Sequence, residues 1–121
     1  MDFRDLEVWK KAHQLTLQVY RATEAFPKEE KYRLVDQLCR AASSVPANIA
    51  EGTGRKTLKE YIQFVCNARG SVEEMKYHLI LAKDLGYLPV EGFDKLEEGY
   101  NEVGRMLNGL INSLRKKDNE R

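Results

Sequence analysis

The 121-residue sequence contains few of the residues that break helices or form cross-links, with three prolines, eight glycines and two cysteines. This scarcity of proline and glycine argues against a disordered or low-complexity chain. Cys39 and Cys66 fall in different predicted helices. One disulfide between them is an alternative, but we expect two reduced thiols in the cytoplasm.

The sequence also lacks an excess of charge of one sign and any long hydrophobic run. Its 20 basic and 19 acidic residues give a formal net charge of +1, which provides no overall attraction to nucleic acid or anionic membrane. No segment approaches the roughly 20 consecutive apolar residues needed to span a bilayer. The first residues, MDFRDLEVWKK, do not resemble a secretion signal. We therefore expect a cytoplasmic protein without a membrane partner.

Apolar residues recur at alternating steps of three and four residues in four parts of the chain, a spacing typical of amphipathic helices. The predicted helices cover about 5–25, 29–51, 57–85 and 90–115. No segment alternates with the period of a strand, and short connections favour antiparallel neighbours. The sequence predicts an all-α fold, with residues 1–121 forming a single antiparallel up-down-up-down four-helix bundle.

Local signals mark several ends of these helices. Phe26-Pro27 ends the first, Thr57 and Glu60 form a capping box for the third, and Gly86 closes that helix. In the fourth helix, the core-facing positions are predicted to include Leu110, with the polar residues after 114 forming a loose tail.

The predicted helices carry more apolar residues than the core of a monomeric bundle requires. Scattered exposed apolar residues are common, but clusters of them usually mark interfaces. We therefore predict self-association. The surplus residues are Trp9, Tyr20, Ile62, Phe64, Tyr77, Ile80, Leu81, Met106 and Ile111.

Residues 43–52, with the sequence SSVPANIAEG, interrupt the pattern of the second helix. Pro46 removes a backbone donor and leaves the carbonyl of Ala42 without its helical partner, so we expect a kink. Ser44, Asn48 and Glu51 share one helix face, and Asn48 occupies a position where an apolar residue is expected. A polar residue at such a position typically fixes helix register or oligomeric state. A ligand or acid-base site at Asn48 and Glu51 is the alternative.

Residues 69–74, with the sequence RGSVEE, lie in the middle of the third helix. Gly70 predicts the close approach of another backbone, and Arg69 or Ser71 could pair with Glu51 or Asn48. We interpret both unusual stretches as devices that set helix geometry and assembly. The residues assigned to this role are Ser44, Pro46, Asn48, Glu51, Gly52, Arg69, Gly70, Ser71 and Glu74.

The sequence offers no recognisable catalytic, metal or cofactor site. Glu74 and His78 lie four residues apart and His13 is isolated, whereas di-iron bundles need two Glu-x-x-His motifs. Both histidines are expected at surface or half-buried positions. Residues 52–56 lack the full spacing of a phosphate-binding loop and follow no strand. We therefore predict a protein without enzymatic activity, metal or cofactor.

Basic residues concentrate in the second helix and the connection that follows it. A solvated helix face is the usual explanation, but in a ring-like oligomer the repeated charge would suit a nucleic-acid backbone. The candidate contacts are Lys31, Arg33, Arg40, Arg55, Lys56 and Lys59.

Residues 3–9 (FRDLEVW), 44–52 (SVPANIAEG), 69–74 (RGSVEE) and 85–88 (LGYL) resemble the four helix bundle protein family, also called the 23S rRNA-intervening sequence protein or S23 family. The resemblance implies a four-helix bundle that forms a homopentamer with a central channel. It implies no catalytic residues. We predict an oligomeric scaffold that binds a protein partner, or alternatively an RNA- or DNA-binding oligomer associated with ribosomal RNA insertions or retroelements.

Overall fold

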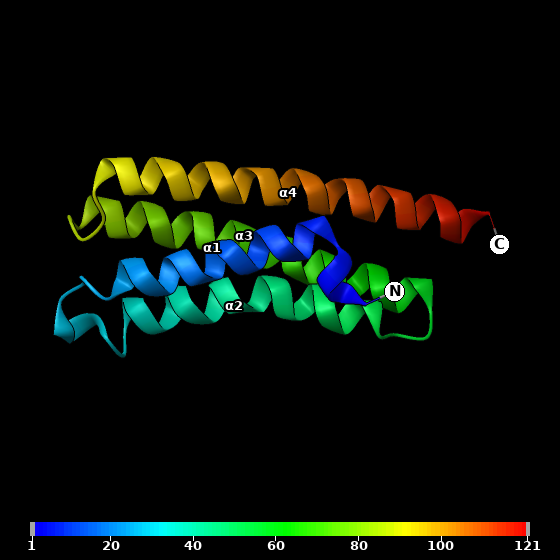
Figure 1. Ribbon diagram of the computed structural model, residues 1–121, viewed down its shortest axis with the longest axis horizontal. Coiled ribbons are helices and arrows are strands. Elements are labelled where there is room, and N and C mark those ends of the chain that lie inside the picture. Colours follow the sequence, from blue (N-terminus) through cyan, green and yellow to red (C-terminus); the bar gives the residue numbers. More distant parts are fainter. Residues whose placement is uncertain (1, 121) are drawn as a thin grey trace.

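The computed structural model describes residues 2–120 and consists of four long helices with short connections (Figure 1). Successive helices run in opposite directions, and no strand occurs among the described residues. The predicted all-α, antiparallel four-helix bundle is therefore confirmed. Its elements are the 3-10 turns η1 (Phe3–Asp5) and η2 (Lys28–Glu30) and the helices α1 (Glu7–Thr23), α2 (Leu34–Thr53), α3 (Leu58–Asp84) and α4 (Val90–Asn119).

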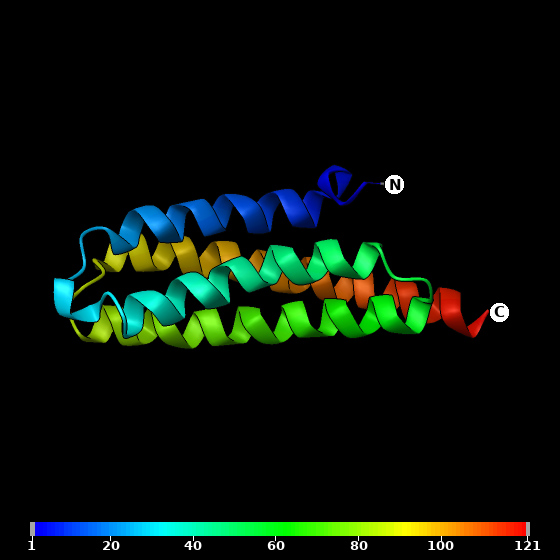
Figure 2. The same ribbon diagram turned by 90° about the horizontal axis from the view of Figure 1, so that it is seen from below.

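The core follows the three-four spacing of the sequence. Each helix turns one apolar stripe inward, and the second view shows the four helices side by side around these stripes (Figure 2). The side chains with the least exposure come from all four helices; they include Val19, Leu38, Val45, Ile49, Val65, Val72, Met75, Tyr100, Val103, Leu107 and Ile111. None of the helices within residues 2–120 combines the length and hydrophobicity needed to cross a bilayer.

Both predicted ends of α3 are confirmed. At its start, the hydroxyl oxygen of Thr57 accepts the backbone N–H of Glu60 at 3.1 Å, and the hydroxyl donates to the Glu60 carboxylate at 3.0 Å. At its end, Gly86 adopts a positive φ of 83°, which allows the N–H of Tyr87 to reach the carbonyl of Ala82 at 3.0 Å. This is a Schellman motif, and only a residue without a Cβ takes this conformation without strain.

The second helix begins at Leu34, five residues later than predicted. Residues 28–30 instead form η2, and Glu30 turns its side chain inward, where it is only 5% exposed. The Glu30 carboxylate accepts the backbone N–H of Leu34 at 3.5 Å, so it serves an otherwise unpaired donor in the first turn of α2.

The last helix differs from the prediction in length and in the register of its apolar face. It continues to Asn119, with Lys116 and Lys117 at the C-terminal end that attracts positive charge. Near this end Ile111 is buried at 1% exposure, whereas Leu110 is only partly buried. An undistorted helix has 3.6 residues per turn, so a strict seven-residue repeat drifts off its buried face over a helix of this length.

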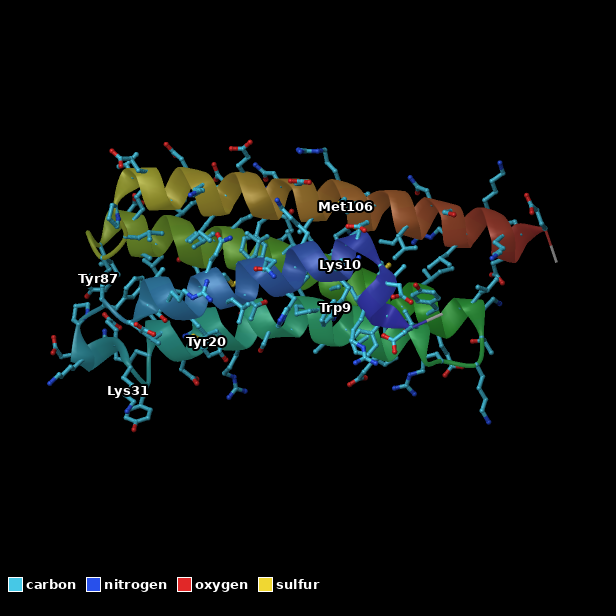
Figure 3. The ribbon with its side chains drawn as sticks, in the orientation of Figure 1. Trp9, Lys10, Tyr20, Lys31, Tyr87 and Met106 are labelled. Atoms are coloured by element: carbon cyan, nitrogen blue, oxygen red, sulfur yellow. The ribbon has the colours of Figure 1, made fainter. Side chains whose placement is uncertain are left out.

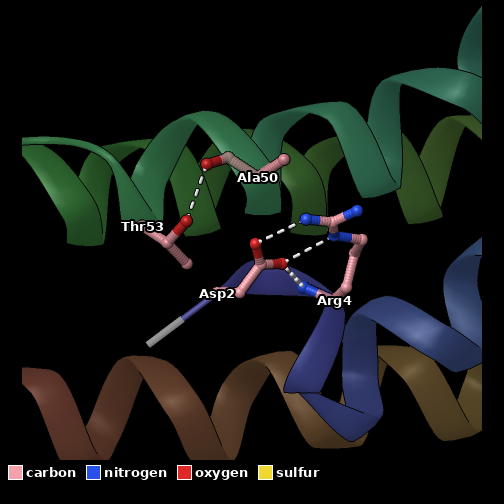
Figure 4. A network of polar contacts seen from close by, with 4 residues as sticks. All are labelled: Asp2, Arg4, Ala50 and Thr53. Atoms are coloured by element: carbon pink, nitrogen blue, oxygen red, sulfur yellow. Dashed lines mark hydrogen bonds and ion pairs between the residues drawn. The ribbon is translucent and has the colours of Figure 1, made fainter.

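The N-terminal turn η1 lies beside the C-terminal part of α2 (Figure 4). The Asp2 carboxylate accepts the backbone N–H of Arg4 at 2.8 Å and two guanidinium N–H groups at 2.8 and 2.9 Å. These hydrogen bonds from Arg4 hold the pKa of Asp2 well below its usual range. The pair therefore stabilises the turn before α1, whose own N-cap residue, Leu6, provides no side-chain hydrogen bond.

Among the glycines of α4, Gly99 is explained by helix packing. A Cβ at Gly99 would lie 2.5 Å from Cδ2 of Leu15 on α1, so the missing side chain allows α1 and α4 to approach closely. Near this contact, Lys11 Nζ and the Glu102 carboxylate form an ion pair at 3.2 Å. The closest neighbour to a Cβ at Gly104 would be Val72 at 3.7 Å, and Gly109 would have no neighbour within 4 Å.

Candidate interaction surface

Three residues of the unusual polar stretches come together between α2 and α3. The Asn48 amide donates to the Ser44 carbonyl at 2.8 Å and to the Ser44 hydroxyl oxygen at 2.9 Å. That oxygen also accepts the hydroxyl of Ser71 at 2.9 Å. The predicted direct pairing of Arg69 or Ser71 with Glu51 or Asn48 is not formed among the described residues; instead Ser44 lies between Asn48 and Ser71 and forms hydrogen bonds with both. These half-buried hydrogen bonds fix the relative position of the two helices, which is a structural role.

The other charged residues of these stretches lie apart from this network. Glu51 is exposed and pairs with Arg55 at 3.5 Å, and no hydrogen bond joins it to Asn48 within residues 2–120. Arg69 donates to the Asn108 side chain on α4 at 3.0 Å instead of pairing with α2. The side chains of Asn48 and Glu51 therefore do not form the paired site that we considered as an alternative.

Pro46 is buried inside a continuous α2, and a side chain from α1 compensates for its missing backbone donor. The Thr16 hydroxyl lies 3.1 Å from the carbonyl of Ala42 and 2.9 Å from that of Ala12. The sequence showed that the Ala42 carbonyl would lose its helical partner, but it did not show which residue would replace it. Thr16 thus joins α1 to α2 at the proline.

Gly52 and Gly70 have different environments. A Cβ at Gly52 would lie 2.9 Å from Cδ1 of Tyr61 and 3.1 Å from Cβ of Phe64, so this glycine permits close packing of α2 on α3. Gly70 is exposed and has no atom within 4 Å of its would-be Cβ. The predicted close backbone approach at Gly70 is wrong within the chain, because the residue lies on the outer face of α3.

The six candidate nucleic-acid contacts do not form a single patch. Lys31 and Arg33 lie before α2, Arg40 lies within it, and Arg55, Lys56 and Lys59 surround the α2–α3 connection at the opposite end of the bundle (Figure 1). A helix of 20 residues such as α2 separates the two ends by about 30 Å. Three of the side chains are paired, Arg33 with Glu30 at 3.4 Å, Arg40 with Asp36 at 4.0 Å and Arg55 with Glu51 at 3.5 Å. Nucleic-acid binding stays a prediction from the sequence.

The most exposed large apolar side chains gather in one half of the molecule. Tyr20 lies in the last turn of α1, and Tyr77 and Ile80 lie in the last two turns of α3. The remaining three belong to the connections or to the first residue of α4. Figure 3 shows Tyr20, Lys31 and Tyr87 toward this end and Trp9 and Met106 farther along the bundle. We call this group of residues the apolar end; it consists of Tyr20, Tyr32, Tyr77, Ile80, Leu85 and Val90.

The surplus apolar residues identified in the sequence fall into three groups. Tyr20, Tyr77 and Ile80 are exposed, as self-association would require. A second group packs partly against the core and consists of Trp9, Ile62, Leu81 and Met106. Phe64 is half-buried, and Cζ of Arg55 lies 4.4 Å from the centre of its ring. Ile111 belongs to the core itself. The exposed surplus is therefore smaller than predicted and more localised.

A groove of about 360 Å³ opens within the apolar end, between the start of α2 and the last turns of α3. Its wall combines apolar, aromatic and polar side chains. They include Glu30, Arg33, Gln37, Tyr77, His78 and Leu81.

Glu30 is a buried carboxylate that the sequence analysis missed. The hydroxyl of Tyr87 donates to it at 2.9 Å, in addition to the contacts with Arg33 and the Leu34 backbone. The hydrogen bond to this carboxylate raises the pKa of Tyr87. The one local signal was a glutamate four residues before the first apolar residue of α2. Its partner Tyr87 lies 57 residues away in the sequence, so periodicity could not identify the pair.

His78 is buried at 6% exposure, whereas we expected a surface or half-buried histidine. Its position on α3 turns it toward α2, where it lines the groove. Nε2 lies 3.1 Å from the Glu74 carboxylate. The other ring nitrogen, Nδ1, is also buried, and no protein atom within residues 2–120 is its hydrogen-bond partner.

Tyr100 also has a buried hydroxyl without a protein partner among the described residues, and burial raises the pKa of Tyr100 far above its usual value. We expect Tyr100→Phe to increase the free energy of unfolding by about 1 kcal/mol, because it removes a desolvated polar group and keeps the ring. Tyr87→Phe is the matched control and should instead lower the free energy of unfolding, because the Tyr87 hydroxyl donates to Glu30. Urea unfolding of both variants measures the difference; equal losses would contradict the assignment.

Within residues 2–120, no three histidine, cysteine, aspartate or glutamate side chains gather as a metal site requires. No curated protein matches the sequence. A crystal structure of a protein with unknown function from the S23 ribosomal protein family of Bacteroides thetaiotaomicron superimposes with a TM-score of 0.78. It is 20% identical and covers 86% of this chain and 97% of its own. A family match extends over residues 4–109, and the chain belongs to the 23S rRNA-intervening sequence protein family.

Proposed function

We propose that this protein is a non-catalytic building block, whose copies assemble through the apolar end into a homo-oligomeric scaffold for a protein partner. The observation that carries the proposal is the placement of the six exposed large apolar residues in one half of the bundle. Exposed apolar patches on soluble proteins usually mark sites of protein association. The pentamer implied by the family resemblance is the assembly that we expect.

The character of the apolar end supports association between copies. Three of its six residues are tyrosines, and tyrosine is enriched in the buried centres of protein interfaces. Tyr32 and Tyr77 are 82% and 60% exposed, respectively, so covering them would remove a large apolar area from water. The same side chains contribute little to the stability of an isolated bundle.

The environment of the reactive groups supports a non-catalytic role. Burial raises the pKa of the Cys39 thiol, which keeps it in the protonated, poorly nucleophilic form. The pKa of Tyr100 rises for the same reason, within the core. The polar residues of α2 and α3 that stand out in the sequence bind one another and set helix positions.

Sedimentation and size-exclusion chromatography with light scattering test this proposal. We expect a species of about five times the chain mass of 14.0 kDa at micromolar concentration. Ile80→Glu should dissociate it, because a charge would replace an apolar side chain at the interface. Ile80 lies outside the groove, so this variant tests the apolar end alone.

Gln63→Glu is the matched control, because it adds the same charge at an exposed position of α3 far from the apolar end. It should leave the assembly mass unchanged. Wild-type protein that sediments as a single chain at micromolar concentration would overturn the proposal. Equal assembly of wild type and Ile80→Glu would show that copies associate elsewhere.

A further inference from the structure

We propose that uncharged side chains along the outer junction of α1 and α2 form the surface on which Tyr77 and Ile80 of a neighbouring copy pack. We call this surface the uncharged strip; it consists of Leu17, Tyr20, Val35, Cys39 and Ser43. This inference rests on the proposed self-association, and it identifies what the α3 part of the apolar end contacts in the next copy.

Contacts across the junction show that the α1 and α2 members of the uncharged strip lie beside one another. The Thr16 hydroxyl reaches the Ala42 carbonyl at 3.1 Å, and the Thr23 hydroxyl lies 3.8 Å from Sγ of Cys39. Both threonines are buried at 8% exposure. The α1 members of the strip lie between these threonines in the sequence and are less buried, so they occupy the outer side of the same junction.

The uncharged strip is accessible to solvent but lacks the composition of a solvated surface. Tyr20 is 50% exposed, and the other members are half-buried. Within the described residues, Leu17 is neither part of the hydrophobic core nor packed against it. The α2 sequence from 41 to 50, AASSVPANIA, has no charged residue, although the outer face of a helix is normally charged and polar. Depletion of charge is typical of the buried centre of a protein interface.

A second copy of the chain is the occupant that fits the uncharged strip. A specific interface covers about 800 Å² and about 20–30 residues on each partner, which is more than the six residues of the apolar end provide. The strip is continuous with the apolar end, because Tyr20 belongs to both. Tyr77 and Ile80 of another copy are 60% and 40% exposed, so they supply uncharged, apolar side chains to cover it.

The strip and these two side chains lie at the same level of the bundle but on different sides. Tyr77 lines the groove together with Gln37, and Cys39 follows two residues later on α2. Among the described helices α1 does not contact α3, so these helices occupy opposite corners of the bundle. Parallel copies around a common axis would therefore bring Tyr77 and Ile80 of one beside the strip of the next. Such a heterologous contact is the one that cyclic assemblies use.

Sedimentation equilibrium of two variants at adjacent positions provides the first test. Leu17→Lys places an unpaired charge in the uncharged strip and should weaken assembly by about 100-fold or more. Gln18→Lys is the matched control, because it adds the same charge at the next residue, which lines the groove between α1 and α4 instead. It should leave assembly unchanged. Leu17 lies outside the core and lysine favours helix about as well as leucine, so both variants should unfold at the urea concentration of dissociated wild type.

The thiol of Cys39 reports on the uncharged strip directly. In the Cys66→Ser protein it is the remaining cysteine, and its reaction with a maleimide can be followed below and above the concentration of assembly. The rate should fall by about tenfold or more when a neighbouring copy covers the thiol. Adding Ile80→Glu, which should prevent assembly, should make the rate independent of protein concentration.

Two results would overturn the proposed contact, and they are distinguishable. If wild type assembles while the Cys39 rate stays constant and Leu17→Lys assembles as tightly as Gln18→Lys, this contact is wrong and the proposed function stands. A wild type that remains monomeric would overturn both.

Discussion

We expect Thr16→Val to reduce the free energy of unfolding by about 1–3 kcal/mol, a large effect for a change that preserves side-chain shape. Valine cannot donate to the carbonyl of Ala42, which the Thr16 hydroxyl reaches at 3.1 Å. The carbonyl also lacks its helical donor, because Pro46 has no backbone N–H. In Thr16→Val the buried Ala42 carbonyl would have neither a hydrogen-bond donor nor contact with water, and this loss lowers the free energy of unfolding. Urea unfolding followed by circular dichroism measures this loss.

A double-mutant cycle with Pro46→Ala separates this explanation from a general packing defect. Alanine at position 46 supplies the N–H that the Ala42 carbonyl lacks, so the Thr16 hydroxyl becomes partly redundant. Thr16→Val should therefore cost less in the Pro46→Ala protein, with a coupling energy of about 1 kcal/mol or more. The same loss in both backgrounds would mean that the hydroxyl acts only on α1, through the Ala12 carbonyl.

We expect Gly99→Leu to reduce the free energy of unfolding by about 3 kcal/mol. Even a Cβ at this position would lie 2.5 Å from Leu15 Cδ2, and Leu15 is itself only 3% exposed. The larger side chain must therefore separate α1 from α4. It would also stretch the nearby ion pair between Lys11 and Glu102. Thermal or urea unfolding provides the measurement.

Gly109→Leu is the matched control on the same helix. Its would-be Cβ has no neighbour within 4 Å, and leucine favours helix by up to about 1 kcal/mol relative to glycine. This variant should therefore be as stable as wild type or slightly more stable. If both substitutions stabilised the protein, the close approach at Gly99 would not constrain the bundle.

The sequence predicted the parts of this fold that depend on local interactions. The four apolar stripes, the capping box at Thr57 and the turn at Gly86 each arise from residues within a few positions of one another. Such signals need no knowledge of the neighbouring helices. The same holds for the exposed Tyr77 and Ile80, which fall outside the apolar stripe of α3.

The groove could not be predicted, because tertiary contacts create it. Glu30 is buried where an acidic residue is expected in solvent, and it is held there by Tyr87, which is distant in the chain. His78 follows the buried Met75 by three residues on α3, and its burial at 6% exposure depends on the helices packed around α3. Thr16 is similar, since its role depends on a carbonyl 26 residues away.

The contact between Leu15 and Gly99 has a consequence for the order of folding. The other helix pairs are adjacent in the chain and meet across short connections, which gives them low contact order and little loop-closure entropy to overcome. Among the four helices, α1 and α4 are the contacting pair that is not consecutive in the described chain. The contact between α1 and α4 therefore forms after α2 and α3 have brought these two helices together. Gly99 lies at this last-formed contact.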